Sequence, residues 1–312
     1  MTLPAQTSAT RTSSERVLAG IGLMLLAMFA FSLNDVMGKW LVATYTVAQL
    51  LLIRSFAALV MLAPAIHRTG LKTILHPENR KLHFARALCS TLEVGLFYLA
   101  VVYLPLADTV AFYLASPILV TLFAVLFLGE KVGWRRWLAV IAGFCGVLIA
   151  VNPTGDGLGW PALIAIAGTV LFAGMTILTR RLAGANEVTL VTWQTVSALG
   201  VGAVLVPFGW VQPGWFDFGA LCLLGVISAL AHMGVNRSLR YAPAATVVPY
   251  QYTLIVWAMI LGYLFFGDWP RTHVIIGSAV IVAAGMYIFI REQVRAREKL
   301  ITPPAPDPRS AG

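Results

Sequence analysis

The strongest constraint on the fold of this 312-residue chain is a series of ten apolar runs, each about as long as a membrane span. A helix needs ~20 apolar residues to cross the hydrocarbon core of a bilayer, and helices are required there because backbone polar groups find no water. We therefore predict an all-α polytopic membrane protein with ten transmembrane helices. The runs lie near residues 18–40, 46–66, 83–104, 107–128, 134–152, 158–179, 188–208, 217–239, 244–266 and 273–291.

Composition supports this prediction. Hydrophobic residues make up 59% of the chain and charged residues only 11%, against roughly 25% charged in soluble domains. The net charge of +9 sits mainly in short loops between apolar runs, which is typical of membrane topology and argues against a nucleic-acid partner. The three cysteines lie far apart inside apolar runs. We therefore expect no metal site and no cofactor.

The chain also repeats itself. The segment from Tyr103 to Gly129 matches the segment from Tyr241 to Gly267, 138 positions later and without a gap. Each half then holds five helices, and because five is odd, the second half enters the membrane inverted. We predict two such repeats, residues 18–152 and 153–291, between a disordered segment, 1–17, and a tail, 292–312. Inverted repeats are typical of secondary transporters.

Basic residues set the expected orientation. Most of the 22 Lys and Arg residues lie in loops on one face of the predicted bundle. The positive-inside rule places this face in the cytoplasm, together with both termini. The first apolar run is too long for a signal peptide and carries Asn34, Asp35 and Lys39 near its end, so we expect a retained helix in the cell inner membrane.

Several motifs resemble the drug/metabolite transporter superfamily, specifically its ten-helix EamA-type members. They include Arg54, Pro105-Leu-Ala-Asp-Thr, Ser116-Pro117, Leu128-Gly-Glu-Lys131 and the run 137–149. The resemblance covers roughly residues 18–291. It implies a secondary active transporter or facilitator that exposes a central cavity, lined by helices 1, 3, 4, 6, 8 and 9, to each side in turn. Ser116-Pro117 has no mirror, because Ile255 stands at the matched position and the second repeat has Pro249 instead.

Ionisable residues inside membrane helices are costly and are candidates for function. Asp35 and Lys39 are four residues apart, which predicts an intrahelical pair near the outer interface. Arg54 lies at a similar depth in helix 2, where it can pair with Asp35 or contact substrate. Because helix 2 is outside the cavity lining that the resemblance implies, we assign structural roles to Asp35 and Arg54.

Glu93 lies near the middle of helix 3 and is the candidate for proton coupling. The alternatives are a counter-charge for a cationic substrate group, or a hydrogen bond to a neighbouring helix. His232, close to its mirror position, can titrate near neutrality or serve as a packing group.

Aromatic and polar side chains near the expected cavity favour a substrate with a flat or apolar part, since aromatic faces offer stacking and cation–π contacts. The candidate substrate-binding residues are Asn34, Glu93, Tyr98, Phe112, Tyr113, Ser116, His232, Asn236, Tyr250, Gln251 and Trp257.

Three further residues receive structural roles. Asp108 follows the Pro105 corner, where an Asp is a good helix N-cap. Pro117 is expected to kink the fourth helix and free a backbone carbonyl. Glu130 is expected to anchor a loop.

The sequence therefore predicts a transporter rather than an enzyme. Its substrate would be a small organic metabolite, such as a flavin, an S-adenosylmethionine-like compound or an amino-acid-related compound. A membrane transferase or hydrolase is one alternative, but the loops offer only scattered single polar groups. A non-transporting sensor or assembly protein is another. Membrane lipid is an expected partner, and we also consider protons as a coupling ion and a homodimeric assembly.

Overall fold

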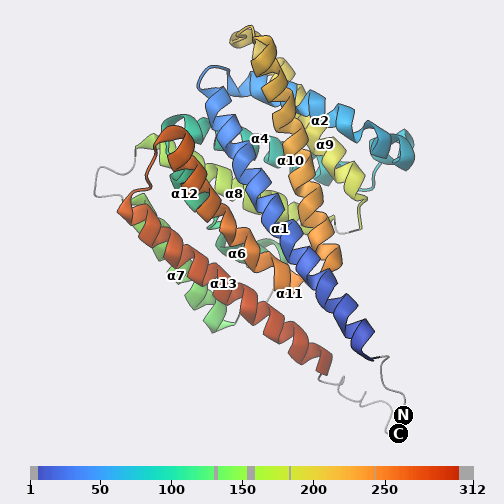
Figure 1. Cartoon of the computed structure of the whole chain (residues 1–312), viewed down its shortest axis with the longest axis vertical. Helices are drawn as coiled ribbons and strands as arrows, with labels where there is room; N and C mark the ends of the chain where they lie inside the picture. The colour runs from blue at the N-terminus through green and yellow to red at the C-terminus, as the bar shows by residue number, and fades with distance from the viewer. Residues whose placement is uncertain (1–5, 130–132, 153–158, 183, 243, 302–312) are drawn as a thin grey trace.

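The computed structural model describes residues 6–129, 133–152, 159–182, 184–242 and 244–301, and within these ranges it contains helices and no strand (Figure 1). Seven helices are long and apolar enough to cross a membrane, and three shorter apolar segments accompany them. These segments correspond to the ten predicted runs. The helices are α1 (Gln6–Val42), α2 (Val47–Thr69), α3 (Leu71–Leu75), α4 (Arg80–Tyr103), α5 (Leu106–Tyr113), α6 (Ser116–Leu128), α7 (Trp134–Val151), α8 (Trp160–Arg181), α9 (Glu187–Leu205), η1 (Val206–Phe208), α10 (Trp215–Tyr241), α11 (Ala244–Val247), η2 (Val248–Tyr252), α12 (Thr253–Phe266) and α13 (Thr272–Ile301).

The terminal helices are longer than the apolar runs predict. Helix α1 begins at Gln6, where we expected disorder, and α13 continues to Ile301, about three turns beyond its apolar run. A helix that is already formed extends readily, because each added residue gains a hydrogen bond. Both extensions reach the same end of the molecule (Figure 1).

The helices pack in pairs that the repeat relates to one another. Helix α1 packs along α10, and their repeat mates α8 and α4 pack along each other. Helix α2 packs on α9 and α7 packs on α13, so each of these helices contacts its own mate. Figure 1 shows α7 and α13 side by side at one edge. This pattern is what a pseudo-two-fold axis between two repeats produces.

Both helices that follow the repeated corner are interrupted near their middle. In the first repeat, α5 ends at Tyr113 and α6 begins at Ser116, with Pro117 in its first turn. In the second repeat, the 3-10 segment η2 precedes α12, which begins at Thr253, the mate of Ala115. Pro117 thus breaks the helix rather than only kinking it, and the second helix breaks at the matched position without a mirror proline.

One end of the bundle, here called the Tyr45 end, contains the loops 43–46, 104–105, 209–214 and 267–271. The Tyr45 hydroxyl donates a hydrogen bond of 2.5 Å to Asp217, and this bond raises the pKa of the Tyr45 phenol. The fully buried Gln49 side chain donates to the Val211 carbonyl at 2.7 Å and accepts from the Val211 amide at 3.1 Å. These contacts tie the start of α2 to the loop before α10.

The outer surface of the bundle is apolar. Large side chains such as Leu163, Leu264 and Leu126 are mostly exposed, which is costly in water and favourable against lipid tails. Aromatic side chains gather at the Tyr45 end, as expected for a membrane interface. They include Trp40, Tyr103, Trp160, Phe208, Trp215 and Trp269.

Candidate functional site

The most connected polar side chain inside the bundle is Arg54 of α2. Its guanidinium donates to the Tyr98 hydroxyl at 2.9 Å and to the Ser228 hydroxyl at 3.1 Å. Its centre also lies 5.4 Å from the centroid of the Tyr98 ring. Helix α10 can approach α2 this closely because it has Gly225 there, where a Cβ atom would lie 2.1 Å from the Arg54 carbonyl oxygen. Arg54 therefore joins α2 and α4 of the first repeat to α10 of the second.

Tyr98 continues the network toward α1. Its side chain is 2% exposed, and its hydroxyl donates to the Asn34 side-chain oxygen at 3.1 Å. The Asn34 amide in turn donates to the Leu224 carbonyl of α10 at 2.7 Å. Arg54 and Asn34 each lie about two turns from the Tyr45 end, which places the network ~10–12 Å below it. Asn34 and Tyr98, both predicted as substrate-binding candidates, are therefore hydrogen-bonded to each other.

Two carboxylates flank this network. The guanidinium of Arg54 interacts electrostatically with both Asp35 and Glu93, and the two carboxylates also interact with each other. Both residues are half-buried. Arg54 takes part in neither of the ion pairs within 4.0 Å that the described residues show. The site thus combines one cation with two carboxylates that no direct ion pair neutralises.

Tyr113 of α5 and His232 of α10 make further contacts with residues of this network. The Tyr113 hydroxyl donates to the Glu93 backbone carbonyl at 3.2 Å, which ties α5 to α4. On α10, the Nδ1 atom of His232 lies 2.7 Å from the Ser228 carbonyl, and its ring meets Phe31 edge-on. Ser228 was not predicted. Its position one turn before His232, in the otherwise apolar run 218–231 of α10, is the signal that could have indicated it.

A second group of candidates lies farther along α1. Tyr250 and Trp257 pack against a buried cluster that contains Met24 and Met28, and the Trp257 ring contacts Phe29 edge-on. The indole nitrogen of Trp257 is buried and has no hydrogen-bond partner among the described residues. The residues Arg54, Tyr98, Asn34, Ser228, Asp35 and Glu93 are called the Arg54 cluster below. The aromatic group adjoins this cluster, because Phe31 packs against the aromatic group and also contacts His232.

The remaining candidates do not join these two groups. Phe112 is buried against Ala100, Ala162 and Ala165, on the side of the bundle formed by α4 and α8. Ser116 is buried at the start of α6. Gln251 is half-buried in η2, on the segment that precedes α12. The side chain of Asn236 and the whole of Glu130 lie outside the described residues.

Two structural predictions were wrong. Lys39 does not pair with Asp35 on its own helix but forms an ion pair of 2.5 Å with Asp268, because the loop after α12 reaches the end of α1. Asp108 is not an N-cap: Pro105 occupies that position, and Asp108 lies inside the first turn of α5. Its carboxylate is buried, and one oxygen has no hydrogen-bond partner in the described part of the chain.

Two other features bear on what the molecule can bind. A hollow of about 320 Å³ lies between α7 and α13, lined mainly by apolar residues such as Leu138, Ala139 and Ala284. Its lining shares no residue with the network around Arg54, and its polar groups are those of Trp134 and Tyr287. No group of three His, Cys, Asp or Glu side chains that could hold a metal ion occurs within the described ranges.

Comparisons with known proteins agree with this architecture. The model of the EamA-like transporter family matches residues 18–152 and 159–290. A riboflavin transporter of Rhizobium johnstonii is 30% identical over 289 residues, covering 91% of this chain and 95% of the relative. An S-adenosylmethionine uptake transporter of Rickettsia bellii is 24% identical over 284 residues, with 90% and 97% covered. The pseudopaline exporter CntI of Pseudomonas aeruginosa is 25% identical over 271 residues, with 85% and 94% covered.

A solved crystal structure superposes with a TM-score of 0.59 at 18% identity, covering 91% of this chain and 99% of the other. At this identity it supports the fold alone. The named relatives are transporters rather than enzymes, and the family match spans both repeats. The chain therefore belongs to the EamA-like transporter family, as a polytopic membrane transporter of small metabolites.

Proposed function

We propose that this transporter carries a planar heteroaromatic metabolite, with a flavin as the first candidate, and that it binds this substrate at the Arg54 cluster. One observation carries the proposal: a single guanidinium is held between Tyr98 of the first repeat and Ser228 of the second, beside two carboxylates. A site shared by both repeats at membrane depth is where alternating access needs its substrate.

The chemistry of the cluster suits a flat ring with polar edges. A flavin ring system presents carbonyl oxygens and an imide N–H on one edge. Arg54 offers donors to such carbonyls, and the carboxylate of Glu93 or Asp35 offers an acceptor for the N–H. The rings of Tyr113, Tyr250 and Trp257 can cover apolar faces. Two riboflavin transporters among the relatives, one of them 30% identical, support the same substrate class.

Proton coupling is assigned to Glu93 in this proposal. Arg54 can balance one of the two carboxylates but not both, so binding and release of a proton at Glu93 changes the net charge of the site. Substrate binding and proton binding then influence each other's affinity, because each changes the electrostatic potential at the site where the other binds.

We further propose that the Tyr45 end faces away from the cytoplasm, in the inner membrane. The opposite end carries the basic loops, including Arg68, Arg181 and Arg240, which the positive-inside rule places in the cytoplasm. Both termini then lie on the cytoplasmic side, since α1 begins and α13 ends at that end of the bundle.

The test is uptake of radiolabelled riboflavin into proteoliposomes that contain the purified protein, with an imposed proton gradient of either sign. We expect saturable flux that exceeds empty liposomes and that excess flavin reduces. Excess S-adenosylmethionine should not reduce it. Flux of S-adenosylmethionine without flavin flux would overturn the flavin assignment while leaving the site intact. The absence of flux with both compounds and with a broad panel of aromatic metabolites would overturn the proposed substrate class.

A further inference from the structure

We infer that Lys39 and Asp268 form a gate at the Tyr45 end, and that Asp108 is the alternative partner that receives Lys39 when this gate opens. The inference rests on the transport cycle proposed above, but it concerns residues outside the Arg54 cluster. It assigns a role in transport to Lys39, which was predicted to pair within its own helix, and to Asp108, which was predicted to be a helix N-cap.

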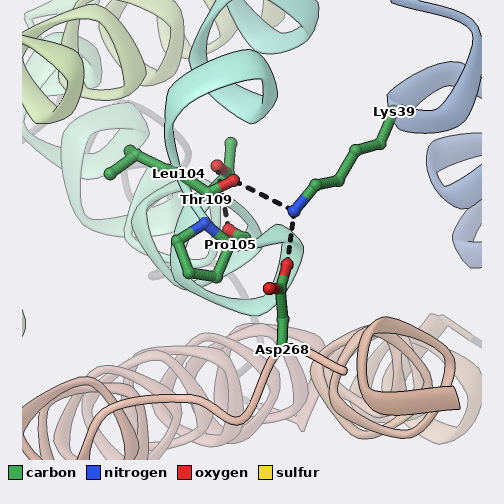
Figure 2. A network of polar contacts seen from close by, with 5 residues as sticks. All are labelled: Lys39, Leu104, Pro105, Thr109 and Asp268. Carbon is green, nitrogen blue, oxygen red and sulfur yellow. Dashed lines mark hydrogen bonds and ion pairs between the residues drawn. The ribbon is translucent and has the colours of Figure 1, made fainter. Parts of the chain in front are cut away.

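The ion pair of Lys39 and Asp268 joins the two repeats at the Tyr45 end (Figure 2). Lys39, in the last turn of α1, forms its 2.5 Å ion pair with Asp268 and donates to the Leu104 carbonyl at 3.3 Å. Its ammonium group also lies 4.8 Å from the centroid of the Phe266 ring. One cation thus holds α1, the corner between α4 and α5, and the loop after α12.

The backbone fixes Asp268 in this place. Helix α12 is followed by Gly267, its C-terminal cap, which has a φ of +68°. The Gly267 amide donates to the Tyr263 carbonyl at 2.9 Å. This left-handed glycine stops the helix and turns the chain, so Asp268 leaves it toward α1. The ion pair is partly shielded, with side-chain exposures of 15% for Lys39 and 30% for Asp268.

Asp108 is the proposed alternative partner of Lys39. It lies one turn from the Leu104–Pro105 corner, is 4% exposed, and has one carboxylate oxygen without a hydrogen-bond partner among the described residues. Its carboxylate interacts electrostatically with Arg271 most strongly, then with Asp268 and least with Lys39. A buried acceptor of this kind is costly to leave unpaired. Lys39 already donates to the Leu104 carbonyl, one turn before Asp108.

The two partners differ in which repeat they belong to. The pair of Lys39 with Asp268 joins the first repeat to the second, whereas a pair of Lys39 with Asp108 would lie within the first repeat. Removing one partner of a shielded ion pair is strongly unfavourable because it leaves an uncompensated charge. Transfer of Lys39 from Asp268 to Asp108 keeps the ammonium group paired, and Asp268, already 30% exposed, can then move away from α1 with the α12–α13 loop.

The opposite end of the bundle carries a related contact. Arg181, at the end of α8, donates to the Phe127 carbonyl near the end of α6. Helices α8 and α6 are the repeat mates of α1 and α12, so a cation at the end of the mate helix bridges the same pair of elements. This bridge is exposed and ends on a backbone carbonyl. The two ends are therefore closed by similar contacts of unequal burial.

Cross-linking tests the gate directly. In a chain with Cys89, Cys145 and Cys222 replaced by Ser, Lys39→Cys and Asp268→Cys are joined by a short bifunctional methanethiosulfonate reagent. A bifunctional reagent is used in place of a direct disulfide because a cysteine is shorter than the lysine that it replaces. We expect flux to fall to that of empty liposomes and to return on reduction. Unchanged flux in the cross-linked protein, or failure to cross-link, would overturn the gate.

A matched control uses the exposed pair of Arg240 and Glu187, whose charged atoms lie 3.8 Å apart within the second repeat. Cross-linking Arg240→Cys to Glu187→Cys should leave flux unchanged, because no gate contact is involved. Loss of flux there as well would show that cross-linking as such stops transport.

Hydrogen exchange separates the gate from the substrate proposal, because it needs no substrate. In the protein in nanodiscs, Asp268→Asn should speed amide exchange in the loop 267–271, since the closed state loses its ion pair. Asp108→Asn should slow it, since the open state loses the partner for Lys39. A purely structural Asp108 would instead give faster exchange when substituted. Faster or unchanged exchange in Asp108→Asn would overturn its role, even if flavin transport is confirmed.

Discussion

The central network depends on the absence of a side chain at Gly38, which makes Gly38→Ala an informative substitution. Gly38 lies on α1 four residues after Asn34, facing the ring of Tyr98. A Cβ atom built on Gly38 would lie 2.0 Å from Cε1 of Tyr98 and 2.9 Å from its Cζ. Ordinary carbon contacts are ~3.5–4.0 Å. The ring would therefore have to retreat by roughly 1.5 Å to reach such a distance.

The surroundings of Tyr98 set the size of the effect. The ring is 2% exposed, so it can retreat only by displacing neighbours, and overpacking of this kind costs about 1–3 kcal/mol. A retreat of that size also takes the bonds to Arg54 and Asn34, now 2.9 and 3.1 Å, beyond hydrogen-bond range. Each lost bond contributes about 1 kcal/mol more. We expect the free energy of unfolding to fall by about 3–5 kcal/mol.

Transport should fall further than stability alone explains, because Tyr98 positions Arg54. A loss of about 1.4 kcal/mol in substrate stabilisation corresponds to a tenfold decrease in rate. The assay compares flux per folded protein and thermal unfolding in detergent. Gly22→Ala is the matched control on the same helix, since a Cβ atom there meets no heavy atom within 4 Å. Wild-type flux and stability in Gly38→Ala would refute the packing argument.

Three other substitutions test separate parts of the structure. Arg54→Lys should lower flux about tenfold, because a lysine cannot hold Tyr98 and Ser228 with a planar fork; wild-type flux would contradict a central role. Glu93→Gln should give flux that no longer varies with pH, whereas the exposed Glu78→Gln should keep the wild-type pH profile. A retained profile in Glu93→Gln would remove Glu93 from proton coupling. Gln49→Leu should lower the free energy of unfolding by about 1–3 kcal/mol, since two backbone groups lose their buried partners, and thermal unfolding measures this directly.

The long apolar helices could be predicted from sequence because hydrophobic length is a local property. Their number and approximate bounds follow from runs that must match the thickness of a bilayer. The interruption between α5 and α6 was also foreseeable, since Pro117 cannot continue a helix. The interruption before α12 contains Pro249, in the first turn of η2, although Ile255 stands where the first repeat has Pro117.

The polar contacts were harder to predict, since they join residues far apart in the chain. Lys39 has an acid four residues earlier, but its partner Asp268 is 229 positions away, and no local pattern indicates it. Arg54 was assigned a structural role from the expected place of helix 2, while its partners Tyr98 and Ser228 come from two other helices. The sequence identified Lys39 and Arg54 as polar residues within membrane helices. Only the structure shows which residues they bond to.

The interrupted helices α5–α6 and η2–α12 have a consequence for mutagenesis. The Ala115 amide donates to the Phe112 carbonyl at 3.0 Å, one residue nearer than in an α-helix, so the Ala111 carbonyl loses the amide that an unbroken helix would supply. In a hydrocarbon environment such a peptide group must find another partner. The Ala111 carbonyl is buried, with its residue 1% exposed, so the partner that satisfies it helps to fix the break between α5 and α6. Alanine scanning cannot remove a main-chain oxygen, so a complete side-chain scan would leave this contribution untested.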